Sequence, residues 1–132
     1  MKEFENNYIK IYFDNIENIV CLRWKSLAPK EKYRESILPL IEIVKYYKSE
    51  KLLCDLINYA PISDADEIWT GINITKQLKE NNVNKIALLL PSSVLGERSL
   101  SDMVDNAELD GSRAQEINYF SNIEHAYEWL KS

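Results

Sequence analysis

The change in hydrophobic periodicity after residue 28 is the feature that most limits how this chain can fold. Residues 8–13 alternate between the two faces of an extended chain, and residues 19–24 do the same. Asp14 and Asn15 between them are typical turn residues. Two strands joined by a short turn pair in the antiparallel sense. The sequence therefore predicts an N-terminal β-hairpin, followed by a segment with a different period.

Helical spacing replaces alternation in the segment 29–47. The apolar residues of one stripe there step by three or four positions. They are Tyr33, Ile37, Leu40, Ile41, Val44 and Tyr47. Pro39 lies in the middle of this segment, where it removes a helical hydrogen bond and clashes with the carbonyl group of Glu35. We expect either a kink near Glu35 and Ser36 or two abutting helices.

Three apolar runs predict further strands, at 52–56, 85–90 and 116–120. The second run is nearly continuous in apolar residues, which is typical of a strand covered on both faces. Helices are expected between and after these runs, so strands and helices alternate once the hairpin has ended. This alternation favours parallel strands joined by right-handed crossovers.

Three helices are expected after residue 62. Ser63 or Asp64 can cap the first of them. Its expected inward stripe consists of Ala65, Ile68, Trp69, Ile72 and Leu78. The second is a short helix with a stripe of Leu100, Met103, Val104 and Ala107. The third begins with a capping box of Ser121 and Glu124. Its expected inward residues are Ile123, Ala126, Tyr127 and Leu130.

These elements predict an α/β fold with a five-stranded, mixed but mostly parallel sheet and four main helices, in the order β-β-α-β-α-β-α-β-α. We expect a single domain over residues 1–132, since domains commonly have about 100–200 residues. Right-handed crossovers between sequential strands should place every helix on one face of the sheet. The other face should then be open, and Tyr8, Tyr12 and Arg23 form a candidate dimer face on it.

The composition argues against several classes of function. The 132 residues carry a formal net charge of −5, whereas non-specific nucleic-acid binding needs a basic surface. Three glycines leave little for a phosphate-binding loop. The single histidine, His125, leaves little for metal or triad chemistry, and we expect it on the surface. We therefore predict no cofactor, no metal site and no catalytic residue.

Cysteine usage and the lengths of the apolar runs indicate a compartment. Cys21 and Cys54 lie within apolar runs, so we expect two buried free thiols in a cytoplasmic protein. The first residues lack the apolar core of a signal peptide. The longest strictly apolar run, 86–90, is far shorter than the about 20 residues that cross a bilayer. No membrane span is therefore expected.

Several features together resemble a known group of proteins. Trp24 closes the second strand, Tyr33 begins a Tyr-Arg-Glu stretch in the first helix, and Asp55 lies in the third strand. The segments 86–91 and 126–130 add to the likeness. On these features the chain resembles the uncharacterised SpoIIAA-like proteins of bacteria, which share the STAS fold of anti-sigma-factor antagonists. The resemblance implies a sequentially ordered sheet, with the first strand antiparallel at one edge, and a regulatory or ligand-responsive protein rather than a catalyst.

One element of the antagonists is missing from this chain. They carry a phosphorylatable serine in an Asp-Ser-Ser-Gly-like element, where the helix after the third strand begins. The corresponding stretch here contains Ser63 but no Ser-Ser-Gly. Ser63 is therefore only a positional candidate for phosphorylation, and an ordinary helix N-cap is the alternative.

Two functions remain open on the sequence. The first is a non-enzymatic regulatory or protein-interaction module of the STAS type, whose expected active surface is the region 55–69. A second copy or a protein partner is also expected on the open face of the sheet and its edge strand. The second is a small-molecule or lipid-binding protein with an apolar pocket between helices and sheet.

The candidate interaction or ligand residues are shared by the two hypotheses. They are Trp24, Tyr33, Asp55, Asn58, Ser63 and Trp69. The alternatives are that Asp55 anchors the loop that follows it and that the aromatic residues belong to the core. A rim of serine and asparagine side chains is a further candidate place for a small ligand. Its residues are Ser26, Asn58, Ser92 and Ser93.

Overall fold

In the part of the chain that the structure describes, six strands form one sheet, and their order across the sheet is their order along the chain. In the computed structural model, which describes residues 2–58, 62–89 and 115–132, the first two pairings are antiparallel and the other three are parallel. The strands are β1 (Phe4–Glu5), β2 (Ile9–Asp14), β3 (Ile19–Trp24), β4 (Lys51–Asp55), β5 (Lys85–Leu89) and β6 (Glu116–Phe120). The prediction of an α/β fold with a mixed, mostly parallel sheet is confirmed.

The predicted count of five strands misses β1. This strand has only two residues, Phe4 and Glu5, which are too few to show alternation. It pairs with β2, so it lies at the edge of the sheet. The predicted hairpin of β2 and β3 is confirmed, and the Asp14 carboxylate stabilises its turn by accepting hydrogen bonds from the backbone N–H groups of Ile16 and Glu17.

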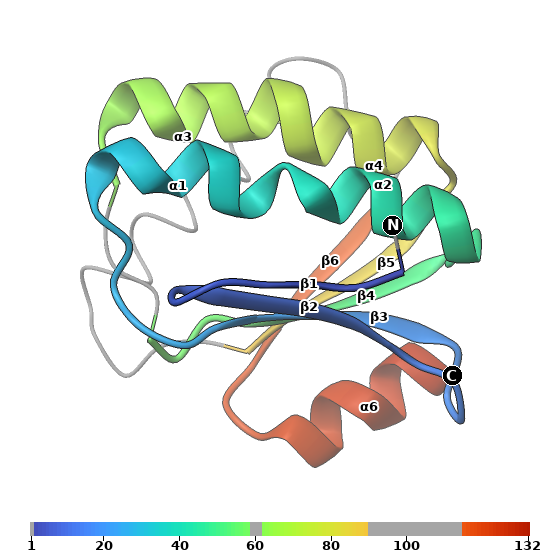
Figure 1. Cartoon of the computed structure of the whole chain (residues 1–132). Coiled ribbons are helices and arrows are strands. Elements are labelled where there is room, and N and C mark those ends of the chain that lie inside the picture. The colour runs from blue at the N-terminus through green and yellow to red at the C-terminus, as the bar shows by residue number, and fades with distance from the viewer. Residues whose placement is uncertain (1, 59–61, 90–114) are drawn as a thin grey trace.

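The helices form two layers, one on each face of the sheet (Figure 1). They are α1 (Lys30–Ile37), α2 (Pro39–Tyr47), α3 (Asp64–Thr70), the π-helical segment η1 (Gly71–Thr75), α4 (Lys76–Glu80) and α6 (Ile123–Lys131). The first five cover one face, and α6 covers the other. Among the described residues, no helix has the length and apolar character needed to cross a membrane.

Pro39 divides the first helical segment into the two abutting helices that were one of the predicted outcomes. The break lies at Leu38, however, and not near Glu35 and Ser36. Pro39 occupies the first position of α2, where a helical residue needs no N–H donor. The Leu38 backbone N–H still bonds the carbonyl oxygen of Arg34 at 3.1 Å, so α1 continues up to the proline.

Alternate residues of the central strands form two hydrophobic clusters. The α1–α4 cluster takes Val20, Leu22, Leu52, Cys54, Ile86 and Leu88 from the sheet. The α6 cluster consists of Ile19, Cys21, Leu53, Ala87, Ala126 and Leu130. Cys54 and Cys21 therefore lie on opposite faces, and both are buried free thiols, as predicted. This alternation is why the middle strands contain almost no polar residues.

The prediction that every helix lies on one face is wrong. The crossover rule governs helices that connect two parallel strands, whereas α6 follows the last strand and connects to none. With α6 on the second face, that face is covered rather than open. Tyr12 packs against the α6 cluster, and Tyr8 packs on the other side of the sheet, against the α1–α4 cluster. Arg23 is exposed. The three residues do not form one dimer face, and self-association stays a prediction without it.

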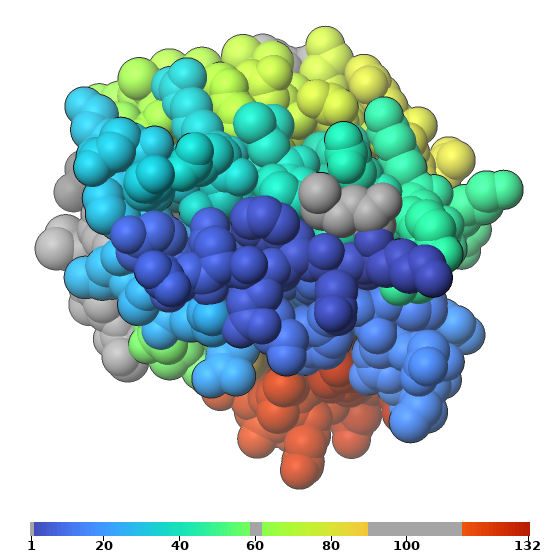
Figure 2. Space-filling view, in the orientation of Figure 1, coloured from blue at the N-terminus to red at the C-terminus, as the bar shows by residue number. Residues whose placement is uncertain are grey.

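The edge of the sheet is visible between the two layers in the space-filling view, where β1 and β2 run across the molecule with α1 and α2 above and α6 below (Figure 2). Two expectations fall outside the described residues. They are the short helix with Leu100, Met103, Val104 and Ala107, and the place of Ser92 and Ser93.

The last helix begins one residue later than its predicted capping box. Asn122, not Ser121, is the N-cap, and its side-chain oxygen accepts hydrogen bonds from the N–H groups of Glu124 and His125. Ala126 and Leu130 are fully buried, as predicted, but Ile123 is 47% exposed. The buried contact of α6 therefore depends on few side chains.

We predict that Leu130→Ala lowers the free energy of unfolding by about 2–5 kcal/mol, because it leaves a cavity between α6 and the sheet. The matched variant Ile123→Ala removes an exposed side chain of the same helix and should change stability by less than about 0.5 kcal/mol. Urea denaturation followed by circular dichroism measures both values. Equal losses in the two variants would contradict the packing of α6 described above.

Candidate functional site

Helix α3 and the start of η1 turn three polar residues inward and two isoleucines outward. Asp66, Glu67 and Thr70 are 4–6% exposed, whereas Ile68 and Ile72 are 49% and 41% exposed. Ala65 is also exposed. The predicted inward stripe is therefore wrong at Ala65, Ile68 and Ile72, although it is right at Leu78, which is buried. Such an arrangement needs buried partners for the polar groups, because an unpaired buried polar group is costly.

Helix α1 supplies partners for two of these polar residues. The Arg34 Nε atom donates to the Asp66 carboxylate at 2.6 Å. The Thr70 hydroxyl donates to the Asp66 carbonyl oxygen at 2.7 Å, and the Tyr33 hydroxyl lies 2.9 Å from Thr70 Oγ1. Since the Thr70 hydrogen is used on the carbonyl group, Tyr33 is the donor to Thr70. We call these contacts of Tyr33, Arg34, Asp66 and Thr70 the α1–α3 tie.

Trp69 extends the α1–α3 tie toward the surface. The Arg34 guanidinium lies 5.1 Å from the centre of the Trp69 ring, which is a cation–π distance. The Trp69 side chain is half-buried, and that of Arg34 is 46% exposed. The Arg34 guanidinium thus pairs with the buried Asp66 carboxylate and also lies over the half-buried Trp69 ring of the same helix.

The π-helical segment η1 changes which residues face the sheet. A π-helical turn holds one more residue than an α-helical turn, so the residues after it are rotated around the helix axis. Before η1 the inward residues are polar, and from η1 onward they are Ile74 and Leu78, which are both buried. Segments of this kind occur often at functional sites.

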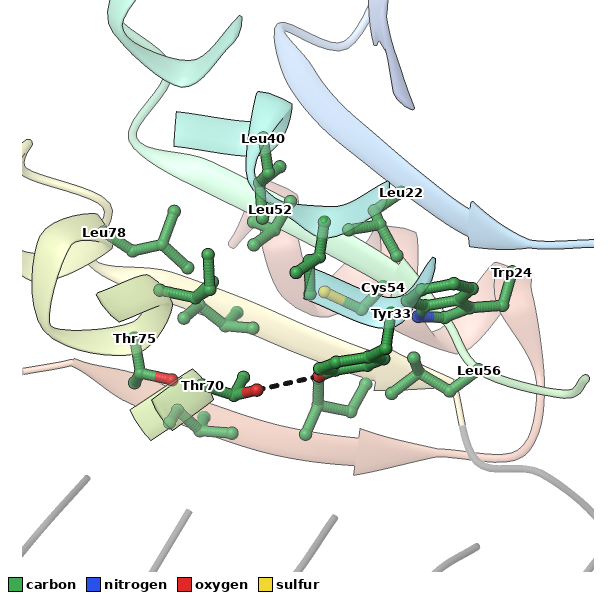
Figure 3. A pocket seen from close by; sticks show the side chains of 15 residues that line it. Leu22, Trp24, Tyr33, Leu40, Leu52, Cys54, Leu56, Thr70, Thr75 and Leu78 are labelled. Carbon is green, nitrogen blue, oxygen red and sulfur yellow. Dashed lines mark hydrogen bonds between the residues drawn. The ribbon is translucent and has the colours of Figure 1, made fainter. Parts of the chain in front are cut away.

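A cavity of about 80 Å³ lies beneath η1, between the sheet and the helices (Figure 3). It is lined by Leu22, Trp24, Tyr33, Ile37, Leu40, Leu52, Cys54, Leu56, Thr70, Ile74, Thr75, Leu78, Ile86, Leu88 and Ile117. The rings of Trp24 and Tyr33 stack on each other, with centroids 5.6 Å apart, and the Tyr33–Thr70 hydrogen bond crosses one side.

The lining of this cavity is uncharged and almost wholly hydrocarbon. None of the described residues around it is acidic, basic or histidine. Burial raises the pKa of the Cys54 thiol to about 12, so the thiol keeps its proton at neutral pH. The cavity is therefore suited to an apolar group, and its described lining offers no charged partner for an anion or a cation.

The sequence-predicted site residues are divided between several places. Trp24 and Tyr33 line the cavity, and Trp69 lies beside Arg34. Asp55 accepts a hydrogen bond from the Ile57 N–H at 3.2 Å, which is the loop-anchoring contact weighed as its alternative. Asn58 donates to the Lys25 carbonyl oxygen at 3.3 Å.

Ser63 is the N-cap of α3. Its hydroxyl oxygen accepts a hydrogen bond from the Asp66 N–H at 3.2 Å, which is the structural alternative to a phosphorylation site. Ser26, the other described serine of the predicted rim, donates to the Asn7 carbonyl oxygen. His125 is exposed on α6.

Arg34, Asp66 and Thr70 were not predicted as site residues. Arg34 belongs to the Tyr-Arg-Glu stretch that begins at Tyr33, but nothing in the sequence pairs it with Asp66. The four-residue spacing of Asp66 and Thr70 places both on one helix face, and this was the available signal. It could not show which way that face turns, because the partners lie on another helix.

A second group of titratable side chains lies under α6. The Tyr127 hydroxyl donates to the Asp14 carboxylate at 3.1 Å and lies 3.6 Å from the Cys21 sulfur. Burial raises the pKa of Cys21, and burial together with the Cys21 contact raises that of Tyr127. A thiol that stays protonated is a poor nucleophile, so this group stabilises the α6 contact rather than offering a reactive centre.

An open polar groove of about 330 Å³ lies at the other end of the sheet. It is lined by Phe13, Glu17, Asn18, Tyr47, Lys48, Ser49, Glu50 and Lys51. Its charges have both signs, and the Ser49 hydroxyl bonds the backbone of Lys51. Because no one kind of polar group dominates this lining, the groove does not indicate a particular class of ligand.

We predict that Asp66→Ala lowers the free energy of unfolding by about 1–3 kcal/mol more than Asp64→Ala does. Both changes remove an acidic side chain from the first turn of α3, but only Asp66 is buried and paired with Arg34. Urea denaturation at neutral pH gives the difference. Losses that agree within error would show that the α1–α3 tie adds nothing to stability.

One of the three comparisons with known proteins gives a match. The SpoIIAA-like family model matches residues 19–131. No curated protein and no solved structure matches the chain. The match extends from β3 to the last residue of α6, and so includes the cavity and the α1–α3 tie. The chain therefore belongs to the SpoIIAA-like family of STAS-type domains.

Proposed function

We propose that this protein is a non-enzymatic regulatory module that binds another protein through the outer face of α3 and η1. The observation that carries the proposal is the reversed polarity of α3 and η1: Ile68 of α3 and Ile72 of η1 are exposed, while Asp66 and Thr70 of α3 are buried. The SpoIIAA-like family consists typically of regulatory STAS modules, and this supports the same class of function.

The outer face has the spacing of a helix that docks into an apolar groove. Ala65, Ile68 and Ile72 are separated by three and four positions, which is the pattern of anchor residues in helix-in-groove recognition. Trp69 and Arg34 lie at the edge of this face. Tryptophan and arginine are enriched among residues that contribute most to binding at protein interfaces. The partner should therefore offer an apolar groove that takes two isoleucine side chains.

The chemistry of the described residues supports a binding role over catalysis. The thiols of Cys21 and Cys54 have raised pKa values. His125 lies on α6, which covers the face of the sheet opposite to α1–α4. Within residues 2–58, 62–89 and 115–132, no group of three acidic, histidine or cysteine side chains is arranged to hold a metal ion. These observations offer no nucleophile with an orienting base.

The double variant Ile68→Asp/Ile72→Asp tests the interaction surface. We expect at least a tenfold lower recovery of the partner that co-purifies with the tagged protein from its own cells, since charged groups would be desolvated in the groove. Quantitative mass spectrometry measures the recovery. Ile16→Asp is the matched control, because Ile16 is 84% exposed in the β2–β3 turn and lies outside α3.

Circular dichroism and the urea midpoint should show that the double variant is folded. If the folded double variant recovers the same partners as the wild-type protein, the outer face of α3 is not the binding surface. If Ile16→Asp loses the partner equally, the effect is one of added charge and the proposal also fails.

A second candidate function is the binding of a small apolar molecule, and the uncharged cavity favours it. Empty apolar cavities in proteins take up benzene or xenon. Under xenon pressure we expect the methyl NMR signals of Ile74, Leu78 and Leu88 to shift, because these residues line the cavity. The exposed Ile16 is the internal control. Equal shifts at all four residues, or none, would contradict an accessible cavity.

A further inference from the structure

We propose that the cavity binds the end of an alkyl chain, about three or four carbon atoms deep, with the rest of the molecule leaving between Thr75 and Ile117. This inference rests on the second candidate function, the binding of a small apolar molecule. It adds the chemical class of the ligand, its depth in the cavity and its path.

The volume of the cavity limits how much of a ligand it can hold. A protein cavity of about 150 Å³ binds benzene, which has six carbon atoms. In proportion, the cavity of about 80 Å³ holds about three carbon atoms, and small side-chain movements add room for about one more. A whole fatty acid or a ring system does not fit, but the terminal segment of a chain does.

The chemistry of the lining requires that this segment is hydrocarbon. The Thr70 hydroxyl is already bonded to the Asp66 carbonyl oxygen and to Tyr33, and the Cys54 thiol is protonated at neutral pH. No described residue around the cavity is charged. A carboxylate, phosphate or ammonium group would be buried there without an oppositely charged partner among the described lining residues, at a large cost in free energy. The polar head of the ligand must therefore stay outside.

The exposure of the lining residues indicates on which side of the cavity the ligand extends to its polar head outside. Thirteen of the fifteen lining residues are buried, and the two that are only half-buried are Thr75 and Ile117. Thr75 ends η1, and Ile117 lies on β6, which is the last strand of the sheet. The side of the cavity between η1 and β6 is thus its most accessible side among the described residues.

A series of n-alkanols from ethanol to octanol tests the depth of the cavity. Trp24 lines the cavity, and the sequence has two other tryptophans, Trp69 and Trp129. The variant Trp69→Phe/Trp129→Phe keeps Trp24 as its single tryptophan, so its fluorescence reports binding in the cavity. We expect the affinity to rise about fourfold for each added methylene until about three or four carbons are buried, and then to stay level.

Two substitutions at adjacent positions locate the opening. Thr75→Phe should plug it and weaken butanol binding at least tenfold. Lys76→Phe places the same ring one residue further along, on an exposed position outside the cavity, and should leave binding unchanged. Equal affinities in these two variants would contradict an opening at Thr75.

Leu78→Ala keeps the proposal falsifiable if Thr75→Phe does not fold. The change removes three carbon atoms from the lining. The alkanol length at which the affinity stops rising, which we call the break, should therefore increase by about three carbons. An unchanged break would overturn the proposed depth. An affinity that rises steadily to octanol in the wild-type protein would overturn the depth while leaving an apolar binding function intact. No alkanol binding together with no xenon shift would overturn both.

Discussion

The hydrogen-bonded contact between α1 and α3 is the interaction on which the helical layer depends. Asp66 and Thr70 are buried because Arg34 and Tyr33 reach them from a helix about thirty positions earlier in the chain. With those polar groups held inward, α3 presents Ile68 to the outside and η1 presents Ile72. The same contacts therefore expose the proposed binding surface and place the Tyr33–Thr70 hydrogen bond at one side of the cavity.

The strands of this protein could be predicted because their alternation is a local property. The residues that turn toward α1–α4 and those that turn toward α6 follow from the two-residue period of β3, β4 and β5. The orientation of α3 could not be predicted in the same way. Its apolar residues have helical spacing, and burial of apolar groups normally decides the inward face. Here the inward face of α3 is set by hydrogen bonds from Tyr33 and Arg34. These residues come close to α3 only when the chain has folded.

The position of α6 shows a similar limit. Its helical stripe was identified, and Ala126 and Leu130 are buried as expected. The face of the sheet that α6 covers was not predicted, because the handedness of crossovers does not constrain a helix that leads to no further strand. Ile19, Cys21, Leu53 and Ala87 nevertheless form an apolar surface that needs a cover. Of the candidate site, the sequence identified Trp24 and Tyr33 by residue type, while the cavity between them and η1 depends on long-range packing.

The π-helical segment η1 makes the surface of α3 sensitive to chain length. Each residue of an α-helix turns the chain by about 100°, and η1 contains one residue more than a regular helix would. A homologous chain lacking one residue between positions 71 and 75 would form a continuous α-helix, and α3 would then be turned by about 100° relative to α4. Ile68 would move away from its outward position, and Asp66 would leave Arg34. A single deletion, without any substitution, would thus give a relative with the same sheet and a different set of side chains on the outer face of α3.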